Sequence, residues 1–138
     1  MKSARIMFII ASVMTILGGT AHFVGQFASG NEGAESLISA MRSFKIGNGP
    51  RPFSFWDVMQ SWGIGMGTDL IWIGLLSLVL AGYLSERPGM LRLAAIINGL
   101  GTLAFVTMAF LYGIIGPGLI MCLPMAAFFL AAIFSRAR

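Results

Sequence analysis

Two ionisable side chains lie inside long hydrophobic stretches of this chain, His22 in the first stretch and Asp69 in the second. Ionisable groups at membrane depth are costly, so they usually face the protein interior and find polar partners. A carboxylate that holds an imidazole can act with it as a general base. The same pair could instead hydrogen-bond a ligand, or lock two helices together. No nucleophile stands beside them in a recognisable motif, which favours a protein that is not an enzyme.

The two residues fall at a similar depth when the hydrophobic stretches form spanning helices. A rise of about 1.5 Å per residue places His22 about 24 Å along a helix that begins at Ile6, and Asp69 about 8 Å along one that begins at Ile64. In antiparallel neighbours across a core of roughly 30 Å, both reach the outer third. We therefore expect His22 to contact Asp69. Three further polar residues near this level could join a network: Gln26, Thr68 and Tyr112.

The composition is that of a membrane protein. Hydrophobic residues make up 57% of the 138 residues and charged residues only 10%, too few to cover a water-facing surface. A spanning helix needs about 20 apolar residues, and four stretches qualify. We expect an all-α, four-helix transmembrane bundle that forms one integral membrane domain, with spans over residues 6–27, 64–84, 91–112 and 115–134.

Lysine and arginine residues near the span ends predict the orientation, because cytoplasmic segments carry an excess of them. With the N-terminus inside, the inner side would hold six: Lys2, Arg5, Arg87, Arg92, Arg136 and Arg138. The outer side would hold three: Arg42, Lys45 and Arg51. This asymmetry favours an N-in, C-in topology, and we expect the bacterial inner membrane because no other targeting signal stands out.

The one long connection, over residues 28–63, is expected on the outer side. Within it, residues 35–46 have the pattern of an amphipathic helix, with four apolar side chains on one face: Leu37, Ile38, Met41 and Phe44. We expect this helix to lie in the membrane interface. A lid over the outer mouth of the bundle is the alternative interpretation of the same pattern.

Small residues indicate where helices pack closely in lipid. Gly63 and Gly67 have the GxxxG spacing just before Asp69, and Gly18 and Gly19 come just before His22. Both pairs predict close packing of the first two spans around the expected contact. In the third span, Asn98 is expected to form a hydrogen bond between helices.

Other binding functions find little support in the sequence. The net charge of +4 is weak and the basic residues are scattered, so we expect no nucleic-acid binding. One cysteine, Cys122, and one histidine make no closed metal site. No motif indicates which cofactor, if any, the protein would use. Membrane lipids are the expected surroundings.

The plan of the chain resembles the small four-span DoxX-like bacterial membrane proteins. The resemblance rests on the size, the expected N-in topology, the stretch Gly18-Gly19-Thr20-Ala21-His22 and the glycine-rich start of the second span. It implies a four-helix bundle, with links to membrane redox partners and quinone-related complexes. It assigns no catalytic residue to this sequence.

Three functions fit these features. The first is an accessory or assembly subunit of a larger membrane complex, because the chain is small, has glycine-rich faces and lacks a catalytic constellation. The second is a binding protein or enzyme for an apolar lipid-, quinone- or isoprenoid-like molecule at a site formed by His22 and Asp69. The third is a proton-coupled transporter, for which four spans would have to assemble as a homo-oligomer.

Overall fold

The computed structural model describes residues 2–27, 34–47, 52–84 and 86–135. Four long helices dominate it: α1 (Lys2–Gly25), α3 (Phe55–Tyr83), α4 (Pro88–Leu111) and α5 (Ile115–Phe134). A short helix, α2 (Ala34–Ser43), separates α1 from α3 in the sequence. Each long helix is long and apolar enough to cross a membrane, which confirms the predicted all-α fold with four spanning helices.

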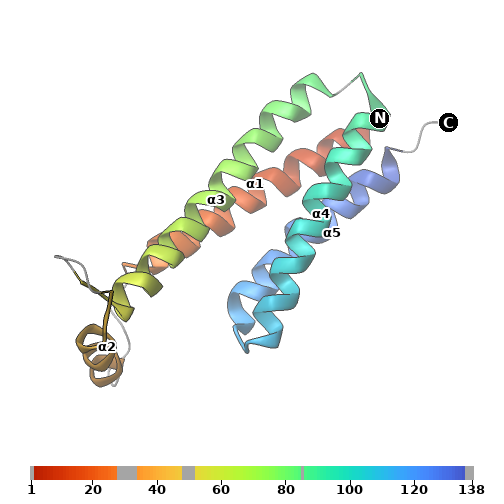
Figure 1. The fold of residues 1–138 in the computed structure, drawn as a ribbon. Coiled ribbons are helices and arrows are strands. Elements are labelled where there is room, and N and C mark those ends of the chain that lie inside the picture. Colours follow the sequence, from red (N-terminus) through yellow and green to blue (C-terminus); the bar gives the residue numbers. More distant parts are fainter. Residues whose placement is uncertain (1, 28–33, 48–51, 85, 136–138) are drawn as a thin grey trace.

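The four long helices form two hairpins that share one contact. Helix α1 packs against α3 and α5, and α5 packs against α4, whereas α3 and α4 scarcely touch among the described residues. Figure 1 shows the α1–α3 pair and the α4–α5 pair close together near the chain termini and diverging toward the end that carries α2. The bundle is therefore open along its α3–α4 side.

The hydrophobic core lies at the end where the hairpins meet. Phe8 of α1 and Phe128 of α5 are fully buried there, and their rings meet edge to face with centroids 5.4 Å apart. Small side chains around them let the helices approach: Ala4, Ala11, Ala81, Ala95, Ala127, Ala131 and Ala132. This joint holds the two hairpins together, and it leaves their other ends without a shared core.

Helix α3 begins at Phe55, well before the expected start at residue 64. The reason is a capping box: the Ser54 hydroxyl accepts the Asp57 backbone N–H at 3.2 Å, and the Asp57 carboxylate accepts the Ser54 backbone N–H at 2.7 Å. Its 29 residues correspond to about 43 Å, more than a hydrocarbon core of roughly 30 Å. The first turns of α3 therefore extend beyond the thickness that a span requires.

The helix expected over residues 35–46 is shorter than predicted. It ends at Ser43, and β1 (Lys45–Ile46) pairs antiparallel with β2 (Phe53–Ser54). Gly47 adopts a φ of 90°, a left-handed conformation that favours glycine and turns the chain. The Phe55 backbone N–H donates to the Phe44 carbonyl at 2.9 Å. Formation of this small ribbon replaces the last turn of the expected helix.

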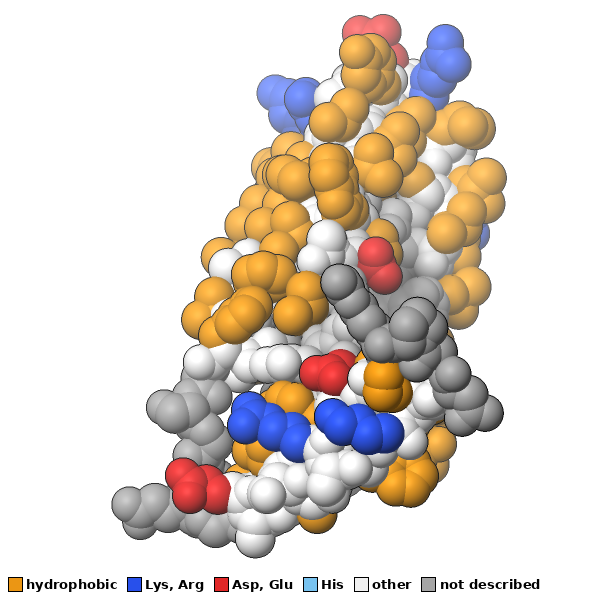
Figure 2. Space-filling view, turned by 60° about the vertical axis from the view of Figure 1, so that its left-hand side comes forward, with side chains coloured by type: hydrophobic (Ala, Val, Ile, Leu, Met, Phe, Trp, Pro, Cys, Tyr) orange, Lys and Arg blue, Asp and Glu red, His pale blue; other side chains and the backbone are white. Residues whose placement is uncertain are grey.

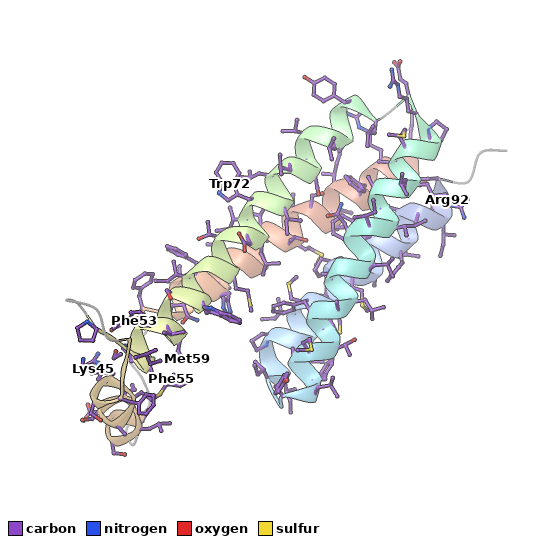
Figure 3. All side chains as sticks on the ribbon, in the orientation of Figure 1. Lys45, Phe53, Phe55, Met59, Trp72 and Arg92 are labelled. Carbon is purple, nitrogen blue, oxygen red and sulfur yellow. The ribbon has the colours of Figure 1, made fainter. Side chains whose placement is uncertain are left out.

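Helix α2 packs mainly against the start of α3 and against β2. The Arg42 guanidinium lies over the Trp56 ring, 5.8 Å from its centroid, in a cation–π contact. Figure 3 shows Phe53, Phe55 and Lys45 at this end of the molecule, beside α2. These contacts favour a helix beside the end of α3 over a lid that crosses to α4 and α5.

Hydrophobic side chains cover most of the long helices on the face that Figure 2 shows, and lysine and arginine side chains gather toward its two ends. Exposed apolar side chains occur on all four long helices, as at Ile6, Leu76, Ile97 and Leu123. Such a surface suits lipid and would be unusual in water. The chain is an integral membrane protein by these criteria.

Candidate functional site

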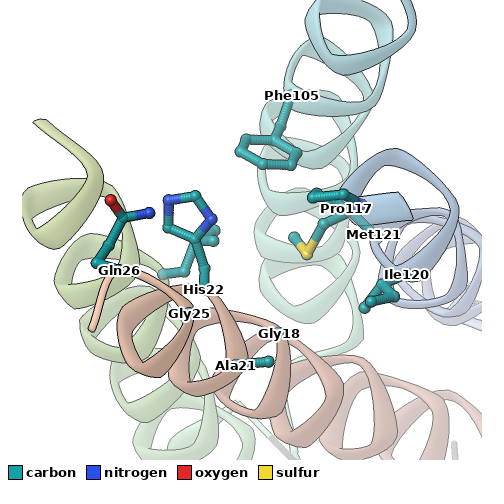
Figure 4. A pocket seen from close by; sticks show the side chains of 10 residues that line it. Gly18, Ala21, His22, Gly25, Gln26, Phe105, Pro117, Ile120 and Met121 are labelled. Carbon is teal, nitrogen blue, oxygen red and sulfur yellow. The ribbon is translucent and has the colours of Figure 1, made fainter. Parts of the chain in front are cut away.

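The diverging hairpins enclose a cleft with three adjoining cavities. The first has a volume of about 330 Å³, and Figure 4 shows it between α1, α4 and α5. Ten residues line it: Gly18, Ala21, His22, Gly25, Gln26, Leu70, Phe105, Pro117, Ile120 and Met121. Most of this lining is apolar, and the polar side chains in it are His22 and Gln26.

The other two cavities extend the cleft along α4 in both directions. One, of about 230 Å³, shares His22, Phe105 and Pro117 with the first and reaches Tyr112. The other, of about 430 Å³, shares Phe105 and reaches Asn98. From residue 98 to residue 112 the cleft follows α4 for about 21 Å, at about 1.5 Å per residue. An elongated molecule would fit its shape better than a compact one.

His22 is the polar centre of the cleft. Its Nε2 atom is shielded from solvent and has no hydrogen-bond partner among the described residues. Figure 4 shows the imidazole projecting from α1 into the space below Phe105. A buried polar atom without a partner is unfavourable and rare in folded proteins. An imidazole nitrogen either donates or accepts a hydrogen bond, according to the tautomer of the ring. Nε2 can therefore bind either a hydrogen-bond acceptor or a hydrogen-bond donor on a ligand.

Gln26 stands one helical turn after His22 and at the rim of the first cavity. Its side-chain amide lies directly over Gly63 of α3, where even a methyl group would overlap it. Gly63 thus makes room for the amide between α1 and α3. Gln26 can offer a second hydrogen bond to a polar group held near His22.

The prediction that His22 contacts Asp69 is wrong. Asp69 is exposed, and no hydrogen bond or ion pair joins it to His22 in the part of the chain that the structure describes. The reason is the rotation of α3, which presents Gly67 to α1. Asp69 follows Gly67 by two residues, about 200° around the helix. The two side chains share a depth but point in different directions.

The remaining polar candidates do not form a network with His22. Thr68 donates its hydroxyl to the Ile64 carbonyl of its own helix at 2.8 Å. Tyr112 follows the last residue of α4 and has 72% of its surface exposed, and it lines the cavity of about 230 Å³ together with His22. Asn98 donates its amide to the Ala94 carbonyl at 2.9 Å, within α4 rather than between helices.

The glycines that were expected at helix contacts do lie there, but Gly18 contacts α5 and not α3. A Cβ on Gly67 would stand 2.9 Å from the Phe23 backbone nitrogen, so α1 and α3 touch along their backbones. Gly18 faces Met121 of α5 instead, with its Cβ position 3.0 Å from the sulfur. Gly74, seven residues after Gly67, belongs to the same contact, and this heptad spacing was a usable signal in the sequence.

Comparisons with protein-family models, curated proteins and solved structures found no match to this chain. The class of protein therefore rests on the fold and the cleft. It is an integral membrane protein in which two helical hairpins, joined at one end, enclose a mostly apolar cleft, and the imidazole Nε2 of His22 in this cleft has no hydrogen-bond partner among the described residues. Within the described ranges no three His, Cys, Asp or Glu side chains gather as a metal site.

Proposed function

We propose that this protein binds an elongated apolar molecule with a small polar head, of the lipid, quinone or isoprenoid type, in the cleft between its hairpins. The observation that carries the proposal is the shielded Nε2 of His22, which has no hydrogen-bond partner among the described residues and lies in a cavity that is otherwise lined by apolar residues and Gln26. A carbonyl or hydroxyl group on the ligand would supply the missing hydrogen bond. Gln26 would give a second one at the rim.

The dimensions of the cleft suit such a ligand. The cavities measure about 230, 330 and 430 Å³, and pockets for small molecules span about 300–1,000 Å³. The largest runs between Ile73 of α3 and Ile97 of α4, away from His22. With the head at His22, an apolar tail would lie in this part of the cleft. The open α3–α4 side would let the ligand enter from the bilayer.

Native mass spectrometry of the protein in nanodiscs tests this proposal. We expect the intact protein to carry one small apolar molecule that survives removal of the bulk lipid. A spectrum that shows the bare chain alone, after mild extraction, would contradict it. Where a molecule is bound, solvent extraction followed by fragmentation would identify its chemical class.

A second candidate function is an accessory or assembly subunit of a larger membrane complex. The observation that favours it is the exposure of the ionisable side chain of Asp69 on α3, a helix long and apolar enough to span the membrane. A charge in that position calls for a partner, and the described part of this chain offers it none. Isolation of the protein from mild detergent as a lone chain would argue against this function.

We also propose an orientation, a compartment and a family for this protein. Six basic residues against three support N-in and C-in. The bacterial inner membrane and a relationship to DoxX-like proteins are proposed from the sequence. Accessibility of cysteines introduced at Ser3 and Ser39 to a membrane-impermeant reagent would test the orientation, because only the second should react from outside.

A further inference from the structure

The face of α3 opposite α1 carries a strip of residues, exposed except at the partly buried Gly65, that we call the Asp69 face. It consists of Trp62, Gly65, Asp69, Trp72 and Leu76, at helical spacings of three and four residues. Trp62 is 74% exposed and Trp72 is 60% exposed. Figure 3 shows Trp72 pointing away from the other helices. Among the described residues α3 packs mainly on α1, which meets it through Gly67 on the opposite side, and α4 and α5 scarcely touch it.

A hollow of about 400 Å³ lies in the outer half of this strip. Asp69, Gly65 and Trp62 line it, together with Ser61, Met66 and Leu70. A Cβ on Gly65 would meet no atom within 4 Å, so nothing in the described chain occupies the space above it. A small residue beside a polar one is the composition at which membrane helices approach each other.

Asp69 supplies the reason to expect an occupant. It lies about 21 Å from the end of α3 at Tyr83, well inside a hydrocarbon core of roughly 30 Å. The described chain gives Asp69 no hydrogen bond and no ion pair. Helix α3 itself carries no lysine or arginine, and Arg42 of α2 stacks on Trp56 at the start of α3. A carboxylate that faces lipid is strongly unfavourable, whereas one that meets a cation is not.

We infer that the Asp69 face docks a transmembrane helix of another protein, which places an arginine or lysine at the depth of Asp69. Charge decides against a second copy of this chain, since two α3 helices packed in parallel through this face would bring two Asp69 carboxylates together. Gly65 admits the backbone of the incoming helix, and Trp62 and Trp72 flank it. This inference rests on the second candidate function and does not depend on ligand binding in the cleft.

A synthetic helix of known sequence tests the inference. The probe is a leucine-based transmembrane peptide with a single arginine five residues from its outer end, and its control has leucine there. Energy transfer between a labelled peptide and the full-length protein in vesicles reports their association. We expect the arginine peptide to associate roughly tenfold more tightly than the leucine peptide, as an intramembrane polar contact of about 1–2 kcal/mol implies.

Three variants make the test decisive. Asp69→Asn should reduce binding of the arginine peptide to the level of the leucine peptide, and Gly65→Leu should block both by filling the hollow. Asp57→Asn, on the same helix but at its capped start, should bind like the parent protein. Equal binding of both peptides, or an unchanged Asp69→Asn variant, would overturn the inference. A complex isolated from membranes that is indifferent to Asp69→Asn would preserve the subunit function and refute this docking face.

Discussion

Gly19 of α1 and Gly67 of α3 bring the two helix backbones into direct contact. A Cβ on Gly19 would lie 2.8 Å from the Gly67 carbonyl oxygen, closer than real side chains come. This contact fixes how α1 and α3 are rotated about their axes. Because α3 turns Gly67 inward, Asp69 points outward, and His22 is left alone in the cleft. The one contact therefore separates the two ionisable residues into two different surfaces.

Substitution of Gly67 should destabilise the α1–α3 hairpin. In Gly67→Ala the new methyl group would stand 2.9 Å from the Phe23 backbone nitrogen, so a rigid backbone would have to move. Overpacking of this kind costs about 1–3 kcal/mol of unfolding free energy. Reversible unfolding in mixed micelles would measure the loss.

The matched control is Gly65→Ala, two residues away on the same helix. Its Cβ would meet nothing within 4 Å, and alanine favours helix over glycine. We expect its stability to equal or exceed that of the parent protein. Equal stability of the Gly67 and Gly65 variants would show that the backbones are not in contact.

Removal of the helix cap should loosen the start of α3. Ser54→Ala deletes a buried hydroxyl that accepts the Asp57 N–H, and loss of such a cap costs about 1 kcal/mol. Hydrogen exchange followed by mass spectrometry should show faster exchange in the first turn of α3. Ser61→Ala removes an exposed hydroxyl that bonds the Val58 carbonyl, and exchange there should stay unchanged.

The joint between the hairpins should be the most sensitive part of the core. Phe128→Ala would leave a void beside Phe8, and such a deletion costs about 3–5 kcal/mol. Phe110→Ala on the exposed side of α4 should cost far less. Unfolding midpoints in detergent would compare the two. Similar losses in both variants would place the core elsewhere.

An obstruction in the cleft should exclude the ligand without unfolding the protein. Ala21 is exposed and lines the first cavity, so Ala21→Trp would fill part of its volume. Leu17→Trp adds a comparable ring on an exposed position that does not line the cavity. We expect ligand loss only in the Ala21 variant. Retention of the ligand by both would place its binding site outside the cleft.

The spanning helices could be predicted because composition and length decide them. Span four was expected over residues 115–134, and α5 has these bounds. The early start of α3 was missed, although Ser54 and Asp57 have the spacing of a capping box. The strand at Lys45–Ile46 depends on pairing with Phe53–Ser54, which the local helical pattern does not contain.

The candidate site could be predicted only in part. Depth along a helix follows from counting residues, and this count places His22 and Asp69 at a similar depth. Direction around the helix depends on which face meets the neighbour, and the glycine contacts decide that. Phe105 and Met121 complete the cleft, yet apolar residues in apolar helices give no signal that separates a cavity wall from a lipid-facing surface.

We propose above that the His22 imidazole holds the polar head of an apolar ligand in the cleft. Native mass spectrometry of the parent protein, His22→Ala and Leu17→Ala in identical nanodiscs tests it most directly. We expect a bound apolar molecule in the parent and in Leu17→Ala, and its loss from His22→Ala with the chain still folded. Equal occupancy in all three, or a bare parent chain, would contradict it.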